Sequence, residues 1–338
     1  MSMKPAVSRS IRVRAFATFL IALAAACAQS VSTGAVLAEQ HAKSELDDAT
    51  RVRLVAFETD LDAALVSINE PALLWVRGLL TRSDDAARAR DLLAAHRAAP
   101  KEMLYLASLA LTCHSYRGAR PAACAESDWV AKWASADRDN AAPWLLLAQR
   151  SLRVRRSDRA IEDLAQGASS PRFDEYWNRA TASAWKVIDT LLPGQGGLAA
   201  IVATGGQPLA ATMTSLVLCR NGPMLQADGA REACTRLVEG PMARADSLSA
   251  RTTAATIAAS LSSDSDKAQA QARLDAISAR DRACSDWLVG QANAGTKASP
   301  PAAAAGQGSV GTSSRVASWI GSLERLDEES ACQQRAAP

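Results

Sequence analysis

The sequence has few aromatic residues, few β-branched aliphatic residues and almost no net charge. Aromatic residues make up only 4% of the 338 residues, although eight of them are Trp. Val and Ile together number 26, whereas Ala and Leu dominate, and this bias favours helices over sheets. Residues 1–28 carry four basic and no acidic side chains, so the rest of the chain has a net charge of −1. Such a balance gives no electrostatic case for a nucleic-acid partner.

Sequence patterns of catalytic and metal sites are also scarce. The three His residues, His41, His96 and His114, have no evident nucleophile or carboxylate partner in the local sequence, and we expect them to be exposed or helix-capping. C-x-x-C pairs, zinc-type Cys/His spacings and P-loops do not occur. A G-x-G-x-x-G pattern at residues 306–311 lies in low-complexity sequence without the preceding strand that a dinucleotide site requires. The sequence therefore predicts no enzyme activity, no metal and no cofactor.

The first 28 residues have the three-part pattern of a secretory signal. Residues 4–14 are basic, residues 15–26 are apolar and uncharged, and small residues follow. The apolar run is about half of the ~20 residues that cross a bilayer as a helix, so a cleaved signal is favoured over a permanent anchor. Cleavage fits after residue 28 or after residue 38, and residues 29–43 are expected to be disordered. The mature protein is then predicted to be periplasmic or secreted.

Cys27 gives the same segment a second interpretation. Ala24-Ala25-Ala26-Cys27 resembles a bacterial lipobox, in which the Cys receives a lipid and becomes the mature N-terminus. That pattern usually has a large aliphatic residue three positions before the Cys, where this chain has Ala24. The resemblance implies an outer-membrane lipoprotein as the alternative to a periplasmic protein, with membrane contact only if Cys27 is lipidated.

The six remaining cysteines agree with export, because exported chains meet an oxidising compartment. Six cysteines allow fifteen pairings in principle, which the local sequence narrows. Cys113 and Cys124 lie on either side of one predicted helix–helix turn, and Cys219 and Cys234 on either side of another. Cys284 and Cys332 are then left to each other by elimination. Three disulfides are thus predicted: Cys113–Cys124, Cys219–Cys234 and Cys284–Cys332.

Apolar residues recur at spacings of three and four through most of the chain, which is the period of amphipathic helices. Residues 44–68 are a clear case, because Leu54, Phe57 and Leu61 fall on one face. Pro, Gly and capping residues divide the rest into further helices. These are expected over residues 71–80, 86–98, 101–113, 121–136, two within 141–174, and 174–192, 207–219, 228–245, 246–261 and 265–289.

One helical pair carries a spaced set of large and small residues: Trp144, Leu147, Ala148, Ala160, Leu164, Gly167 and Pro171. These positions resemble the tetratricopeptide repeat, a pair of helices of about 34 residues, although Ser151 stands where the repeat has an aromatic residue. Weaker traces of the spacing, at Leu92, Ala95 and Pro100, extend the resemblance over about residues 69–174. It implies a curved stack of helical hairpins, which commonly presents a concave surface to a peptide or protein.

The predicted fold is therefore all-α, with antiparallel helical hairpins stacked as a short solenoid of the tetratricopeptide type. A Gly- and Pro-rich stretch at residues 193–208 is expected to separate two helical halves. The expected parts are repeats over 44–193, a C-terminal half over 194–289, a disordered Ala/Gly/Ser/Pro linker over 290–313, a short helix over 314–332 and a tail over 333–338.

A basic cluster lies between the two helices of the best repeat: Arg150, Arg153, Arg155, Arg156 and Arg159. Such a run is usually a solvated face, and its functional alternative is a site for acidic partners or anionic lipid head groups. Acidic residues within 58–62 and 324–329 are candidate internal partners for this cluster. The recurring Trp residues are expected to pack in the core, with the lining of a concave groove as the alternative.

Together these patterns predict an exported protein of a Gram-negative-type bacterium that binds a protein or peptide without catalysis. The alternatives are a lipid-tethered structural component of the outer membrane and an envelope enzyme whose site is dispersed over several helices.

Overall fold

The computed structural model describes residues 48–66, 70–81, 84–116, 120–204, 209–220 and 223–297. Every regular element in these ranges is a helix, which confirms the all-α class that the composition favours. The predicted signal, Cys27, residues 298–313 and the predicted C-terminal helix lie outside the described residues, so the expectations about them stay predictions.

The helices of the first half are α3 (Asp48–Leu65), α4 (Pro71–Leu80), α5 (Asp85–Ala98), α6 (Met103–Ser115), α7 (Ala122–Ala125), α8 (Trp129–Ala136), α9 (Ala141–Arg153) and α10 (Ser157–Ser169). The second half is counted from α11, ahead of the predicted break at 193–208. Its helices are α11 (Trp177–Leu191), α12 (Gly196–Thr204), α13 (Ala210–Cys219), α14 (Ala230–Glu239), α15 (Leu248–Leu261) and α16 (Lys267–Lys297). Two short 3₁₀ helices, η1 (Pro223–Gln226) and η2 (Met242–Arg244), connect parts of the second half.

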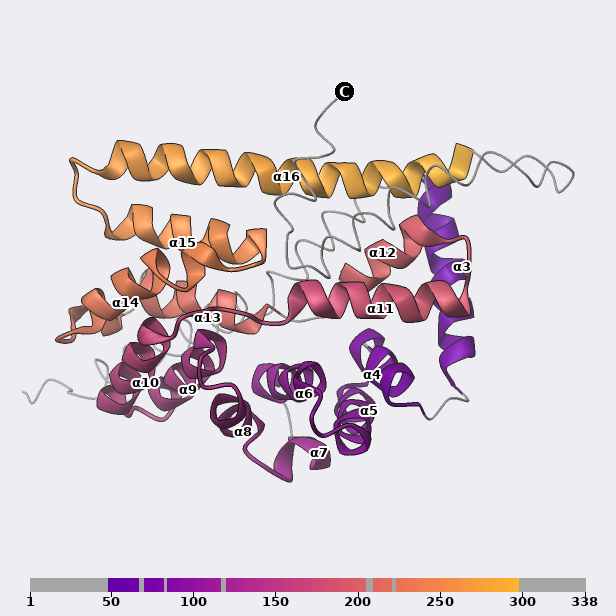
Figure 1. The fold of residues 1–338 in the computed structure, drawn as a ribbon, viewed down its shortest axis with the longest axis horizontal. Helices are drawn as coiled ribbons and strands as arrows, with labels where there is room; N and C mark the ends of the chain where they lie inside the picture. Colours follow the sequence, from indigo (N-terminus) through magenta and orange to yellow (C-terminus); the bar gives the residue numbers. More distant parts are fainter. Residues whose placement is uncertain are drawn as a thin grey trace, which may run out of the picture.

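Helices of the first half pack in pairs: α4 with α5, α6 with α8, and α9 with α10. The pairs lie side by side in the lower layer of Figure 1, because α5 packs on α6 and α8 packs on α9. Glycines allow close approach within the pairs. A Cβ at Gly78 of α4 would lie 2.8 Å from Cγ of Leu92 on α5. Likewise, a Cβ at Gly167 of α10 would lie 3.3 Å from the Cβ of Trp144 on α9.

Capping residues explain where several helices begin. Asp84 accepts hydrogen bonds from the backbone amides of Ala86 and Ala87 at 2.9 Å and starts α5, as the sequence predicts. Asp128 accepts from the amide of Ala131 at 3.1 Å and starts α8. The single helix predicted over 121–136 is therefore wrong, because this cap divides it into α7 and α8.

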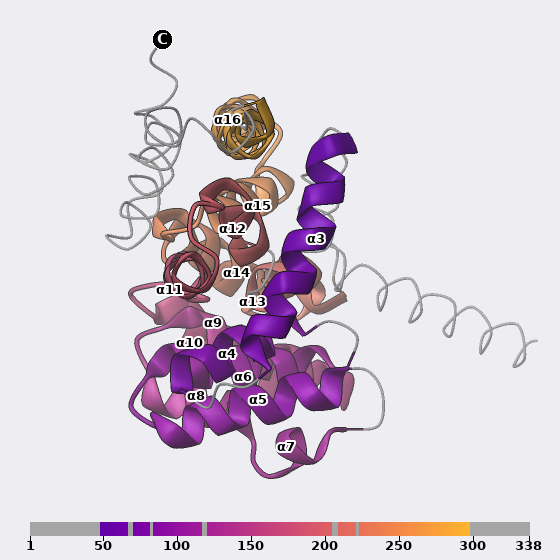
Figure 2. The same ribbon diagram turned by 90° about the vertical axis from the view of Figure 1, so that its right-hand side faces the viewer.

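The second half folds back over the hairpin layer. α11 packs on α4, α13 packs on α6 and α9, and α14 packs on α10. Figures 1 and 2 show α15 beyond these helices and α16 on the side of the molecule farthest from the hairpins. The first helix of each pair is thus covered by helices of the same chain.

Two predicted irregular segments contain helix. The Gly-rich stretch at 193–208, expected as a break, includes α12, whose residues Leu198 and Ile201 are buried. α16 continues to Lys297, so residues 290–297 of the predicted disordered linker are helical. That part of the linker prediction was wrong, because a helix already formed extends over isolated glycines at about 1 kcal/mol each. Proline, a stronger helix breaker, first occurs after this stretch at Pro300.

Candidate functional site

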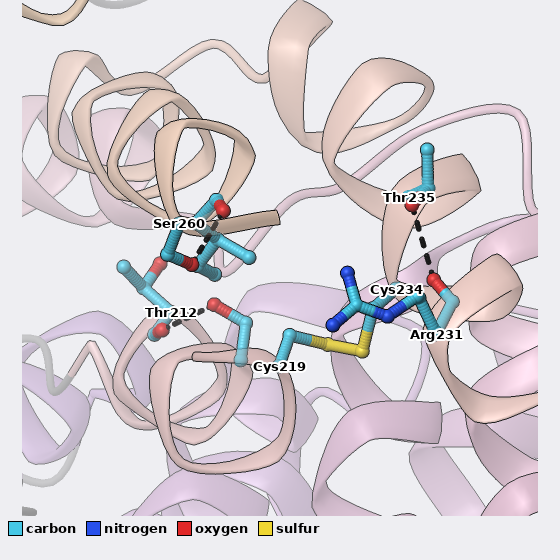
Figure 3. The surroundings of a disulfide bond; sticks show 8 residues. Thr212, Cys219, Arg231, Cys234, Thr235 and Ser260 are labelled. Carbon is cyan, nitrogen blue, oxygen red and sulfur yellow. Dashed lines mark hydrogen bonds between the residues drawn. A yellow bond between two sulfur atoms is a disulfide. The ribbon is translucent and has the colours of Figure 1, made fainter. Parts of the chain in front are cut away.

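Both disulfides predicted across helix–helix turns are present in the structure. Cys113 on α6 is bonded to Cys124 on α7, with a Cα–Cα distance of 5.3 Å. Cys219 at the end of α13 is bonded to Cys234 on α14, with a Cα–Cα distance of 5.5 Å (Figure 3). These separations lie in the usual range for protein disulfides. Each bond joins two helices that follow one another closely in the chain, which is why local sequence could identify the partners.

The remaining cysteines are partly outside the described residues. Cys284 lies on α16 and is itself disulfide-bonded. Cys332, its predicted partner, and Cys27, the candidate for lipidation, lie outside the part of the chain that the structure describes. The pairing of Cys284 with Cys332 therefore stays a prediction.

Two arginines of the predicted basic patch are held by nearby acidic side chains. Arg150 forms an ion pair with Asp128 at 2.6 Å. Arg159 forms ion pairs with Glu162 at 3.1 Å and Asp163 at 3.0 Å. These partners come from α10 and the start of α8, and not from the acidic residues within 58–62 that the sequence suggested. The patch is thus partly neutralised within its own hairpins.

The rest of the basic patch lies at the turn between α9 and α10. Arg153 donates to Oε1 of Gln149 at 2.8 Å. Arg155 and Arg156 are exposed, beside Val154, whose side chain is 60% exposed. All five arginines of the patch are therefore exposed, and its role as a site for an anionic partner stays a prediction.

Four of the seven Trp residues that the structure describes are buried in the core. Trp75 and Trp133 are fully buried, and Trp129 is buried against α7. Their indole groups find buried partners, such as Oγ of Ser108 at 3.0 Å from Nε1 of Trp75. The preferred sequence interpretation, core packing, is correct for these three residues.

His114, for which the sequence predicted an exposed or helix-capping side chain, lies in the last turn of α6 and is buried. Its Nε2 lies 2.6 Å from Oε1 of Gln149, so α6 and α9 enclose a buried polar pair. The ring of His96 packs edge-on against Trp129, with centroids 5.8 Å apart, and burial together with the nearby Lys132 charge lowers the pKa of His96. His41 lies outside the described residues.

A buried polar cluster surrounds Asp137, in the turn between α8 and α9. Its carboxylate accepts hydrogen bonds from Nδ2 of Asn140 and from the hydroxyl of Tyr176, both at 2.8 Å. It also accepts from the guanidinium of Arg172 and, at 3.3 Å, from Nε1 of Trp133. Tyr176 has a φ of 61°, a left-handed conformation that costs of order 1–3 kcal/mol in a bulky residue. The cluster fixes residues 170–176 against the α8–α9 turn.

Glu175, next to this cluster, joins the two halves of the chain. Its buried carboxylate accepts hydrogen bonds from the backbone amides of Ala211 at 2.6 Å and Thr212 at 3.1 Å, and from the Thr212 hydroxyl. Burial raises the pKa of Glu175 to about 7. The side chain thus supplies hydrogen-bond acceptors to the first turn of α13. Sequence reasoning missed these contacts because Ala211 and Thr212 lie 36 and 37 positions after Glu175 in the chain.

Besides Val154, the large exposed apolar side chains of the described residues lie on α3 or directly after its end. Val52, Val55 and Val66 are 71%, 64% and 73% exposed. The opposite face of the same helix is buried and includes Leu54 and Leu61. α3 and the residue after it therefore expose three apolar side chains to solvent, which sequence reasoning did not single out. The signal was present, because Val52, Thr59 and Val66 repeat every seven residues.

Among the residues that the structure describes, no three His, Cys, Asp or Glu side chains are grouped so that they could hold a metal ion. None of the described helices combines the length and apolar character needed to cross a membrane. Comparison with known proteins found no matching family model, no curated relative and no similar solved structure.

Proposed function

We propose that this chain is an exported, disulfide-stabilised helical-repeat protein that binds another protein and performs no catalysis itself. The observation that carries the proposal is the exposure of Val52 and Val55 on α3 and of Val66 directly after its end. Single exposed apolar residues are common, whereas several that recur along one segment favour an interaction surface. Because the other face of α3 already packs on the body, a second apolar face is best explained by a partner.

The partner is not expected in the concave surface that stacked hairpins usually offer. In this chain α11 and α13 cover the first helices of the hairpins. α3 stands at the edge of the molecule, where Figure 2 shows it running diagonally past the other helices. We therefore place the protein-binding surface on α3, while the relation of the α4–α10 hairpins to tetratricopeptide repeats remains part of this proposal.

We propose that the partner contributes an amphipathic helix with basic residues beside its apolar stripe. The seven-residue spacing of Val52, Thr59 and Val66 matches the seam between two packed helices. Exposed Asp60 and Asp62 lie among these residues and favour basic groups on the partner. Helix-on-helix docking of this kind is a common mode of peptide recognition.

The compartment is part of the same proposal. Two disulfides support a place outside the reducing cytosol. We propose the periplasm, reached through the predicted signal in residues 1–28. If Cys27 is lipidated, the protein is instead tethered to the outer membrane, and Cys27→Ser would then abolish its membrane fractionation.

Photo-crosslinking in the native envelope tests the binding surface. A benzophenone side chain is introduced separately at Val55 and Val66, and at Arg156 as an exposed control on the α9–α10 turn. We expect Val55 on α3 and Val66 directly after it to crosslink to the same protein, through a peptide with an amphipathic, basic pattern, and Arg156 not to do so. Val52→Asp should reduce the crosslink at Val66 at least about tenfold, because a charge in the seam costs roughly 1.4 kcal/mol or more of binding.

Several results would contradict this function. Crosslinks at Val55 and Val66 no stronger than at Arg156 would remove α3 as the surface. Crosslinks to a second copy of the chain or to lipid would replace the proposed partner with self-association or membrane contact. Circular dichroism of each variant checks that the helical fold is retained.

A further inference from the structure

A groove runs along α16, opposite α14, η2 and α15. Two adjoining cavities of about 260 Å³ each share four lining residues, and therefore form one continuous groove. Its shared lining consists of Ala243, Arg251, Arg273 and Ile277. The groove is distinct from the exposed face of α3, so the occupant of the groove is independent of the function proposed for that face.

The two ends of the groove differ in charge. Among the described residues, one end is lined by Arg251, Arg273 and Arg280 and by no acidic side chain, together with apolar Leu248. The other end includes Glu239 and Asp266. Arg251 is held in position because its Nε donates to the backbone oxygen of Ala245 at 2.6 Å. The basic end fits a segment that carries acidic side chains next to an apolar face.

Cys284 marks the same end of the groove. It follows Arg280 by four residues, so both side chains project from one side of α16. Cys284 is disulfide-bonded, and the two other bonds of the described residues join Cys113 to Cys124 and Cys219 to Cys234. If Cys27 leaves with the signal or receives a lipid, Cys332 is the remaining partner.

The sequence that ends at Cys332 has the character that the groove requires. Its apolar residues fall at helical spacing, and its acidic residues gather just before the cysteine. The apolar set is Val316, Trp319, Ile320, Leu323 and Leu326, and the acidic set is Glu324, Asp327, Glu328 and Glu329. If Cys332 is bonded to Cys284 and the segment runs as a helix along the groove, residue 314 lies roughly 27 Å beyond Cys284 and so about 47 Å from Lys297. The sixteen residues 298–313 can just span this distance, since they reach roughly 50 Å when extended.

We propose that residues 314–332 bind in this groove of their own chain, and that a Cys284–Cys332 disulfide holds them there. The acidic residues of the segment meet Arg273 and Arg280, and its apolar face covers Ile277 and Leu248. The bond forms when the two thiols pass two electrons and two protons to a disulfide oxidant of the compartment, which becomes a dithiol. The groove is then an interaction surface for an acidic amphipathic helix, supplied in cis.

The test measures how strongly the folded full-length chain holds the two thiols together. The chain is equilibrated with reduced and oxidised glutathione, trapped by alkylation, and the linked Cys284–Cys332 peptide is quantified by mass spectrometry. A flexible tether alone gives an effective thiol concentration on the order of millimolar. We expect a higher value for the wild type, and a loss of at least about tenfold in R273E/R280E because the segment no longer binds.

Matched variants separate binding from general charge effects. R155E/R156E makes the same charge change on the α9–α10 turn and should leave the effective concentration within about twofold. The charges of the segment can be reversed as well, by adding E324R/E328R to R273E/R280E. This combination should recover most of the effective thiol concentration that R273E/R280E loses. R273Q/R280Q provides a milder change if the charge-reversed variant fails to fold.

Three outcomes would overturn the proposal. The first is an equal effective concentration in the wild type, R273E/R280E and R273Q/R280Q. The second is a Cys284–Cys332 bond found between two chains, which would show exchange of the segment between copies. The third is a bond from Cys284 to any other cysteine.

Discussion

Glu175 holds a carboxyl group between the two halves of the chain, where it accepts hydrogen bonds from the first backbone amides of α13. Burial raises its pKa from an ordinary 4.5 to about 7. In the unfolded chain the group loses its proton near the ordinary value. Between these two values the folded chain therefore binds more protons than the unfolded chain, and the free energy of unfolding falls as the pH rises.

We predict that Glu175→Gln removes this part of the pH dependence. The contribution of Glu175 is fully present below about pH 4.5 and is lost as the pH rises through about 7. An amide at this position does not titrate but keeps one oxygen to accept from α13. Urea midpoints at pH 5, 6 and 7 should therefore decline less steeply in the variant. Exposed Glu162→Gln serves as the control, and parallel slopes for Glu175→Gln and the wild type would contradict the role.

The Asp137 cluster leads to a second prediction at this scale. Asp137→Asn removes a buried negative charge that Arg172 and Tyr176 contact directly. Because Arg172 is 42% exposed, water screens part of its attraction to Asp137. We therefore expect the free energy of unfolding to fall by about 2 kcal/mol. Glu162→Gln, which breaks an exposed pair with Arg159, should cost less than about 1 kcal/mol. Urea unfolding of both variants measures which substitution destabilises the fold more. A smaller cost for Asp137→Asn than for Glu162→Gln would contradict a stabilising role of the Asp137 cluster.

Residue pairs could be predicted from sequence where they lie close along the chain. Cys113 and Cys124 are separated by 11 positions and Cys219 and Cys234 by 15, so a single turn brings each pair together. The Asp137–Arg172 contact spans 35 positions and depends on how two hairpin ends meet. Nothing in the local sequence specifies that meeting, so the polar cluster was missed.

At the scale of elements, two glycines in helices provide opposite tests of packing. A Cβ at Gly78 would lie 3.1 Å from the backbone nitrogen of Leu92 and closer still to its side chain, so Gly78→Ala should force α4 and α5 apart. We expect a loss of about 1–3 kcal/mol, despite the better helix propensity of Ala.

Gly290→Ala is the matched control, because a Cβ at Gly290 of α16 meets nothing within 4 Å. Ala should stabilise this helix by up to about 1 kcal/mol through its lower conformational entropy in the unfolded chain. Urea unfolding of the whole chain measures the destabilisation expected for Gly78→Ala. Amide exchange of α16 measures the stabilisation of that helix expected for Gly290→Ala. Equal behaviour of the two variants would show that Gly78 does not set the helix separation.

Helix positions could be predicted well where a local residue ends or begins the helix. Pro71 begins α4, and its observed end at Leu80 agrees with the prediction. Asp84 likewise caps α5. The prediction failed where a cap was overlooked, at Asp128, and where glycines were taken to stop α16. Periodicity locates a helix, whereas its ends depend on single side chains and on neighbours that the local sequence does not include.

At the scale of the molecule, one hydrophobic core crosses the expected boundary between the halves. It includes Leu164 of α10, Leu218 of α13 and Leu237 of α14. The sequence predicted two halves separated near residues 193–208, because Gly and Pro are frequent there. The sequence could not show that α11 and α13 cover the hairpins. An apolar helix face indicates that the helix packs on something, but not which other helix it packs on. For the same reason the outer face of α3 became a candidate site only with the fold in view.

A shared core predicts that both halves unfold together. Leu237 of α14 is fully buried, and α14 packs on α10 of the first half. We expect Leu237→Ala to cost about 2–5 kcal/mol through lost contacts and a cavity. Six of the eight Trp residues lie between residues 75 and 185, so Trp fluorescence reports mainly on the hairpins and α11.

The urea midpoint measured by Trp fluorescence should therefore fall in Leu237→Ala by the same amount as the midpoint measured by far-ultraviolet circular dichroism. Exposed Val52→Ala should leave both midpoints nearly unchanged, because that side chain is 71% exposed. If fluorescence kept its wild-type midpoint while circular dichroism showed an earlier transition, the second half would be unfolding independently. The packing of α13 and α14 on the hairpins would then contribute little to stability, since cooperativity between the halves requires that their interface be lost in the same transition.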